Sequence, residues 1–309
     1  MHRPALPGHR PPCRREAKTL DISSGILFQT IINGIMLGSI YAMVALGLAL
    51  IYGILEIPNF AHGTLYMLGA YIAYQLIISL GFPYWAALFC SAAILFFIGM
   101  FIERIAFRPL YAQPMINSFI VAVGLILILE NGVLAIWGPA FKRFPRASSS
   151  VFHLLNITIT AQRVIVIVTA VLLIIALHFF IRHTRLGSAI EATSQNRKGA
   201  QLMGINVSMV GGLTFGLGTA LAAIAACLVA PVLLIYPTMG GPVIAMAFVI
   251  IILGGMGSFL GAVVGGYIIG LAETLFASYV TTDYVEALIF GILVLVLSVK
   301  PTGLFGKGH

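Results

Sequence analysis

The segment IRHTRLGSAIEATSQNRKGAQLMGINV, residues 181–207, is a polar interruption between two long apolar runs. Glycines at its positions 187 and 204 bracket a stretch able to form a short helix. Four basic residues lie in it, Arg182, Arg185, Arg197 and Lys198. A loop this long and this patterned is more than a connector between neighbouring helices. We interpret it as a docking element for a cytosolic partner; an ordinary amphipathic interhelical loop is the alternative.

The composition is that of a membrane protein. Of the 309 residues 60% are hydrophobic and only 8% are charged, whereas a soluble domain has about 25% charged residues. Successive apolar runs are long enough to cross a bilayer, which takes about 20 residues each. We therefore expect an all-α, polytopic helix bundle with about eight membrane segments, some of them discontinuous. The runs are 26–55, 65–80, 84–102, 118–137, 164–181, 209–235, 243–253, 259–276 and 285–299.

The first 22 residues contain many Pro, Arg and His residues and lack the apolar core of a signal peptide. We expect 1–22 to be a disordered basic extension and 23–309 to form the transmembrane domain. The first apolar run is longer than a span needs, so we expect an interfacial turn near Gln29 and Asn33. A tilt or break is expected near the small residues Gly34, Gly38 and Ser39.

Two polar or glycine-rich interruptions suggest broken helices. The run 243–253 is too short to span a bilayer and is joined to the next run by GGMGS at 254–258. Such a short, interrupted segment is typical of a discontinuous helix beside a transport pathway. The break NFAHG at 59–63 is its candidate partner in the first half. The many glycines in the second half favour close helix packing, with a pore-lining or hinge role as the alternative.

The distribution of basic residues does not decide the orientation. If 181–207 is cytosolic, helix alternation places eight basic residues inside and nine outside. Five of the nine are in the N-terminal extension. That extension is then either absent from the native protein or held inside by a first segment that does not fully cross.

Six motifs, in order along the chain, resemble the permeases of branched-chain amino-acid ABC importers of the LivH type. The glycine-rich ones would be weak alone, but together the six span most of the chain. They are NGIMLGSIYAMVALGLALIYGI (33–54), NFAHG with YMLGAY (59–71), ERIAFRPL (103–110), TRLGSAIEATSQNRKGAQLMGIN (184–206), ILGGMGSFLGAVVGG (252–266) and KPTGLFG (300–306).

The resemblance implies a multi-pass subunit of the bacterial inner membrane that translocates leucine, isoleucine or valine. It implies a second homologous permease subunit, two cytosolic ATPase subunits that bind ATP, and a periplasmic substrate-binding protein. Segment 182–207 resembles the coupling segment that docks on the ATPase. The coupling residues expected from it are Arg185, Gly187, Glu191, Ala192, Asn196 and Gly204. Glu191 departs from the pattern, because relatives commonly have a basic residue there.

Polar residues inside or beside apolar runs are the candidates for a substrate pathway, since such groups are costly in a membrane. Asn59 and His62 flank the first break and would meet a zwitterion, or Asn59 would simply cap a helix. Glu130 and Asn131 interrupt the run 118–137, where they would serve the pathway, contact another subunit or reach the interface. Glu273 is the candidate for an interior polar contact.

Other classes of function have less support in the sequence. We expect no catalytic residues, no metal site, no cofactor on this chain and no nucleic-acid partner, because no Walker A, HExxH or G-x-S-x-G pattern occurs. An ion-coupled secondary transporter is the main alternative, with Glu130 and Glu273 as its only deep carboxylates. Within the ABC class, urea, short-chain amides or other amino acids are alternative substrates.

Overall fold

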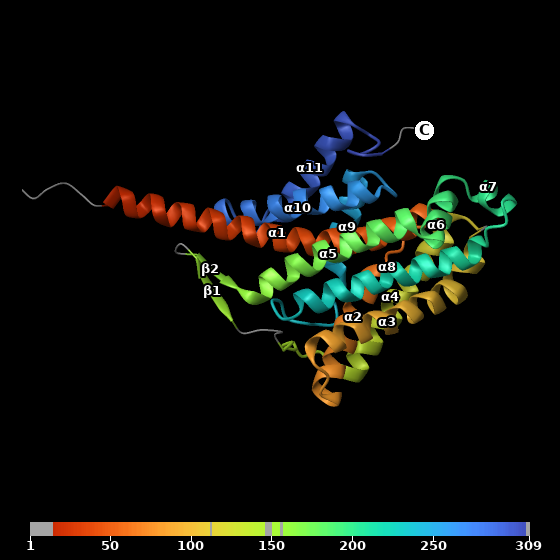
Figure 1. Cartoon of the computed structure of the whole chain (residues 1–309), viewed down its shortest axis with the longest axis horizontal. Helices are drawn as coiled ribbons and strands as arrows, with labels where there is room; N and C mark the ends of the chain where they lie inside the picture. The colour runs from red at the N-terminus through yellow and green to blue at the C-terminus, as the bar shows by residue number, and fades with distance from the viewer. Residues whose placement is uncertain (1–14, 112, 146–149, 155–156, 307–309) are drawn as a thin grey trace, which may run out of the picture.

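The computed structural model describes residues 15–111, 113–145, 150–154 and 157–306. It is a bundle of long helices with one small hairpin of strands (Figure 1). The long helices are α1 Arg15–Leu55, α2 His62–Leu80, α3 Tyr84–Ile102, α4 Met115–Trp137, α5 Ala161–His183, α8 Val207–Val229, α9 Gly240–Gly254, α10 Phe259–Tyr279 and α11 Val285–Val299. The strands β1 Val151–Leu154 and β2 Ile157–Thr160 pair antiparallel.

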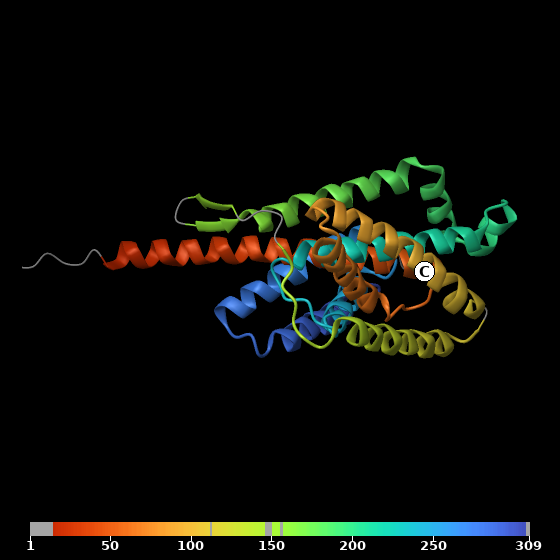
Figure 2. The same cartoon turned by 90° about the horizontal axis from the view of Figure 1, so that it is seen from below.

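Among these residues, seven helices are long and apolar enough to cross a membrane: α1, α2, α3, α4, α5, α8 and α10. The expected all-α polytopic bundle is thus confirmed. Helices α9 and α11 have 15 residues each, about 22 Å of length, which falls short of the roughly 30 Å hydrocarbon core. Figure 2 shows α4 along one edge of the bundle, where few of its side chains are buried.

Helix α1 is continuous from Arg15 to Leu55, so the expected turn and break are wrong. Its small residues serve packing against α10 instead. A methyl group added at Gly38 would lie 2.9 Å from the Tyr267 Cα atom. The Ser39 hydroxyl donates to the Ile35 carbonyl of its own helix at 2.7 Å and lies 3.0 Å from the Tyr267 hydroxyl of α10. Small residues here allow two backbones to approach without interrupting either helix.

The N-terminal extension is described only in part. Residues 15–22 continue α1 outward from its apolar part, and residues 1–14 lie outside the described residues. Helix α1 has a 31-residue apolar span, Gly25–Leu55. This helix is long and apolar enough to cross a membrane, and the start of α1 lies at the end of the bundle opposite α6 and α7 (Figure 1).

Helix α8 is the centre of the bundle, and most of its side chains are buried. It packs against α1, α2 and α3. At its midpoint a methyl group added to Gly218 would lie 2.7 Å from the Gly47 carbonyl oxygen of α1. On its other side the Thr219 hydroxyl donates to the Leu95 carbonyl of α3 at 2.8 Å. The core is thus built on close backbone approach rather than on large side chains alone.

Helices α9 and α10 form an antiparallel hairpin, so the expected discontinuous helix across GGMGS is wrong. Gly254 packs on Gly261, and a methyl group added at Gly265 would lie 3.1 Å from the Ile250 carbonyl oxygen. From the first of these contacts to the second, the position goes back along α9, from 254 to 250, and forward along α10, from 261 to 265. The two helices therefore run antiparallel. Gly255 and Gly257 adopt positive φ values of 101° and 78°, which turn the chain sharply between the two helices.

Candidate functional site

The polar segment that follows α5 folds into two short helices, α6 Arg185–Gln195 and α7 Arg197–Leu202. Both are capped by side chains of the expected kind. The Gly187 N–H donates to Thr184 Oγ1 at 3.0 Å, and the Gly199 N–H donates to Asn196 Oδ1 at 2.8 Å. Gly204, with φ of 82°, ends the second helix. The segment is therefore two ordered helices rather than the single short helix expected between the glycines.

One face of α6 is seated on the bundle and the other is open. Gly187, Ile190 and Thr193 are buried, and a methyl group at Gly187 would lie 2.5 Å from the Ile181 Cα atom of α5. Arg185 and Glu191 are exposed, and neither has an ion-pair partner within the described part of the chain. Of the remaining residues expected here, Ala192 is half-buried and Asn196 is exposed.

The tip of this segment exposes apolar side chains to solvent. Leu202 and Met203 are 88% and 83% exposed, the highest values among the large apolar residues described. Leu202 ends α7 and Met203 follows it, at the end of the bundle and just before the membrane span α8 begins at Val207. Because water is a poor neighbour for such side chains, their exposure is typical of a surface that another protein covers.

A buried polar cluster anchors the segment to the end of α3. Glu103 is fully buried within the π-helical turn Glu103–Phe107 and receives Arg108 Nε at 3.2 Å and Nη2 at 3.0 Å. The Tyr111 hydroxyl also donates to Glu103. Burial, followed by the hydrogen bond to Glu103, raises the pKa of Tyr111, so this phenol stays protonated and remains a donor.

The same cluster reaches α7 and α8. The Arg197 guanidinium lies 4.5 Å from the centre of the Tyr111 ring, a cation–π contact. Arg108 Nη2 also donates to the Ser208 carbonyl at 2.9 Å. Tyr111 and Ser208 were not among the expected residues, because their contacts with Arg197 and Arg108 respectively are not local motifs in the sequence. Arg104, the neighbour of Glu103 in the sequence, is exposed.

A second junction lies at mid-depth, where α2 and α9 both begin. A methyl group at Gly47 would lie 3.1 Å from His62 Nε2 and 2.7 Å from the carbonyl of Gly218, the central residue of α8. At the other side a methyl group at Gly63 would lie 2.8 Å from the Ile244 Cβ atom of α9. The break 56–61 thus returns the chain into the bundle, beside the start of α9.

Two residues expected on the substrate pathway, Asn59 and His62, lie at this junction. Both have buried polar atoms without a hydrogen-bond partner. The Asn59 Oδ1 atom accepts the Ala61 N–H at 3.1 Å, but its Nδ2 has no partner. His62 is fully buried, and neither ring nitrogen has a hydrogen-bond partner; the ring faces the Val44 backbone without reaching hydrogen-bond geometry. Buried polar groups normally are satisfied, and the positive ends of two helix dipoles meet at this place.

The other expected pathway residues lie elsewhere. Glu130 is half-buried and Asn131 is exposed on α4, with Asn131 Nδ2 bonded to the Leu127 carbonyl at 2.7 Å. Glu273 on α10 is half-buried beside the Tyr41 hydroxyl, and its second carboxylate oxygen has no partner. The structure therefore brings together Asn59 and His62, but it places Glu130 with Asn131, and Glu273, at separate positions. Within the described residues no group of three or more His, Cys, Asp and Glu side chains is placed to hold a metal ion.

Comparisons with known proteins assign the family. The family described as branched-chain amino acid transport system / permease component matches residues 30–297. The chain belongs to this family. It is 36% identical to the high-affinity branched-chain amino acid transport permease LivH of Escherichia coli K12, over 90% of this chain and 95% of that protein. It is 34% identical to the permease BraD of Pseudomonas aeruginosa, with the same coverage.

A solved structure supports the fold of this branched-chain permease family member. The chain resembles a chain in the structure of PsaBC from Streptococcus pneumoniae in complex with Fab, with a TM-score of 0.53 and 13% identity over 94% of this chain and 98% of that one. At this identity the likeness shows the fold alone. With its seven apolar spans, the permease is a multi-pass protein of the bacterial inner membrane.

Proposed function

We propose that this permease is the membrane-spanning subunit of an ATP-driven ABC importer that carries leucine, isoleucine and valine. The single observation that carries the proposal is the two-helix segment α6–α7 at one end of a family permease. Its helices have side-chain caps, α6 packs on α5, and Arg197 contacts Tyr111 beyond the end of α3. Leu202 and Met203 are exposed at its tip. These are the properties of a rigid element that transmits force to a partner.

The partners follow from the same segment and from the family. Two cytosolic ATPase subunits would bind ATP and receive the exposed tip, with Arg185, Glu191 and Asn196 on the docking side. A second homologous permease would complete the membrane part, and a periplasmic binding protein would deliver the amino acid. A partner can shift the equilibrium between outward-open and inward-open states only through contacts that differ between the two states.

The mid-depth junction of α2 and α9 is the proposed place where the substrate meets this chain. The unsatisfied atoms of Asn59 and His62 and the adjoining helix starts suit a zwitterionic amino acid, because helix N-termini favour a carboxylate. Both helices can move only with the elements on which they rest. A methyl group at Gly53 of α1 would lie 3.7 Å from the Gly257 Cα atom of the α9–α10 turn and 4.0 Å from the Ser194 Cβ atom of α6, so motion of α6 would reach α9 through the end of α1.

Reconstitution tests the proposal. The permease is placed in proteoliposomes with the candidate second permease, ATPase subunits and binding protein, and uptake of labelled leucine, isoleucine, valine, urea and an alanine control is measured. We expect uptake of the three branched-chain amino acids that requires ATP and disappears with an ATPase unable to hydrolyse it. Uptake of urea or other amino acids alone would refute the substrate assignment, and uptake driven by an ion gradient without ATPase would refute the ABC mechanism.

A further inference from the structure

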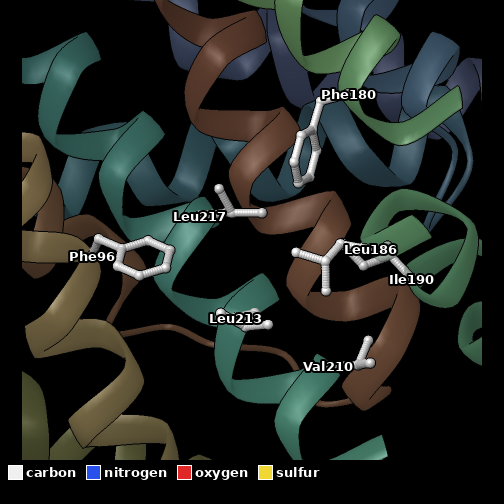
Figure 3. A pocket seen from close by; sticks show the side chains of 7 residues that line it. All are labelled: Phe96, Phe180, Leu186, Ile190, Val210, Leu213 and Leu217. Atoms are coloured by element: carbon white, nitrogen blue, oxygen red, sulfur yellow. The ribbon is translucent and has the colours of Figure 1, made fainter. Parts of the chain in front are cut away.

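An apolar groove runs along α8 toward the α6 helix. Its volume is about 240 Å³. Figure 3 shows its lining side chains converging from α3, α5, α6 and α8. They are Phe96, Phe180, Leu186, Ile190, Val210, Leu213 and Leu217. Every one is apolar, so no polar group in the lining would hold water there.

The groove opens between spans rather than inside the core. Phe96, Phe180, Leu213 and Leu217 are half-buried and Leu186 is 44% exposed, while Ile190 and Val210 form the buried floor. Helix α3 packs closely along α8, whereas α5 stands away from α3 and is mostly unburied by this chain. The medium that faces these spans is the hydrocarbon of the bilayer. An apolar chain from the membrane is therefore the ligand to which the lining is suited.

Three basic residues lie at the α6 end of the elements that line the groove, outside the lining itself. Arg104 follows α3, Arg182 lies in the last turn of α5, and Arg185 begins α6 next to the lining residue Leu186. All three are exposed, and none has an ion-pair partner in the described residues. Arg108, by contrast, is held by Glu103. Unpaired basic residues at a membrane surface attract anionic headgroups.

We propose that the groove is a binding site for one anionic phospholipid of the leaflet on the α6 side. One acyl chain lies over Val210, Leu213 and Leu217, and the headgroup phosphate lies near Arg182 and Arg185. The lipid then supports the underside of α6 beside Leu186 and Ile190. The groove is distinct from the junction of α2 and α9 and needs no amino-acid substrate.

Native mass spectrometry of the full-length chain with its co-purifying subunits tests the site. The probes are phosphatidylglycerol and phosphatidylcholine with identical acyl chains. We expect one phosphatidylglycerol retained at collision energies that remove phosphatidylcholine. Leu213→Trp fills the groove and should reduce retention at least threefold, while the matched Leu172→Trp on the membrane-facing side of α5 should leave it unchanged.

A second pair of variants separates the headgroup from the chain without altering the groove. The double variant Arg182→Gln/Arg185→Gln should lower phosphatidylglycerol retention toward that of phosphatidylcholine, and Arg143→Gln at the opposite end should not. Equal retention of the two lipids by the native chain would overturn the anionic assignment. Retention unaffected by Leu213→Trp, or lost when a second permease subunit binds, would overturn the lipid site itself.

The expected effect of the lipid on transport rests on the proposed function. Different results would contradict the two. We expect ATP-driven uptake in vesicles with phosphatidylglycerol to exceed that in pure phosphatidylcholine vesicles severalfold, and Leu213→Trp to abolish the difference. Absence of uptake in both kinds of vesicle contradicts the proposed function and leaves the mass-spectrometric result standing. Equal uptake in both contradicts only the role of the lipid in transport.

Discussion

The carboxylate Glu103 combines a local ion pair with a buried position. In sequence it stands beside Arg104 and Arg108 at the end of an apolar run, which indicates an interfacial anchor with a local ion pair. In the structure it is fully buried and accepts hydrogen bonds from Arg108 and Tyr111. A carboxylate removed from water remains stable only when its oxygens are satisfied in this way.

Two substitutions measure this cluster. Tyr111→Phe removes one donor to Glu103 and should lower the free energy of unfolding by about 1–2 kcal/mol. Glu103→Leu leaves the Arg108 guanidinium without its carboxylate and should cost more, about 2–4 kcal/mol after allowance for the partial exposure of Arg108. Thermal unfolding in detergent measures both. A cost for Glu103→Leu below that of Tyr111→Phe would contradict the buried ion pair.

His62 offers a test in which stability and function should move in opposite directions. A buried imidazole without partners is costly, so His62→Leu should leave the thermal stability unchanged or higher. If His62 meets the substrate, the same variant should lower leucine uptake at least tenfold. The control is Tyr71→Phe, which removes another buried, unpartnered hydroxyl and should leave uptake unchanged. Normal uptake by His62→Leu would remove this residue from the proposed pathway.

Among the secondary-structure elements, the apolar runs predicted the helices well, because nearly every long run became one. Where helices break was harder to predict. Small residues near Gly38 suggested a break in α1, but they are used for contact with α10. The glycines at 254–257 suggested a broken span, but they make the turn of a hairpin. A glycine in a sequence indicates either that another backbone approaches closely or that the chain turns there. Which of the two applies depends on the helix that packs beside it.

The candidate site was predictable to the same degree. Local signals located the capped segment α6–α7 and the break at Asn59 and His62. Contacts between distant parts of the chain could not be inferred from one sequence, and these include Arg197 on Tyr111 and the pairing of the C-terminal segment with α9. In that pairing the Leu304 N–H donates to the Leu253 carbonyl at 2.8 Å.

The seat of α6 on α5 is tested by enlarging its closest glycine. Gly187→Ala places a methyl group 2.5 Å from the Ile181 Cα atom, so α6 must shift, at a cost of about 1–3 kcal/mol. Uptake should fall sharply while the amount of permease in the membrane stays normal. The control Gly132→Ala introduces a methyl group with no atom within 4 Å and should be neutral. Full uptake with Gly187→Ala would show that the position of α6 does not govern transport.

In the whole molecule, the proposed functional elements follow one another along the length of the bundle. An ordered two-helix segment lies at one end, the junction of α2 and α9 lies at mid-depth, and the α9–α10 turn lies between them. The start of α1 and the strands β1 and β2 lie at the opposite end (Figure 1). If ATPase subunits bind the α6–α7 end, the opposite end must receive the substrate. In this arrangement the tip at Leu202 and Met203 lies against an ATPase.

The most direct measurement is a thiol-attached photo-cross-linker at Leu202→Cys, in a variant without native cysteines and in membranes that contain the candidate ATPase subunits. Ser79→Cys, at the exposed far end of α2, is the matched control. We expect Leu202→Cys to cross-link to the ATPase with a yield that changes when ATP is added, and Ser79→Cys to give no such product. Cross-linking to the ATPase from Ser79→Cys alone would show that the orientation is the reverse and that the tip at Leu202 and Met203 does not lie against the ATPase.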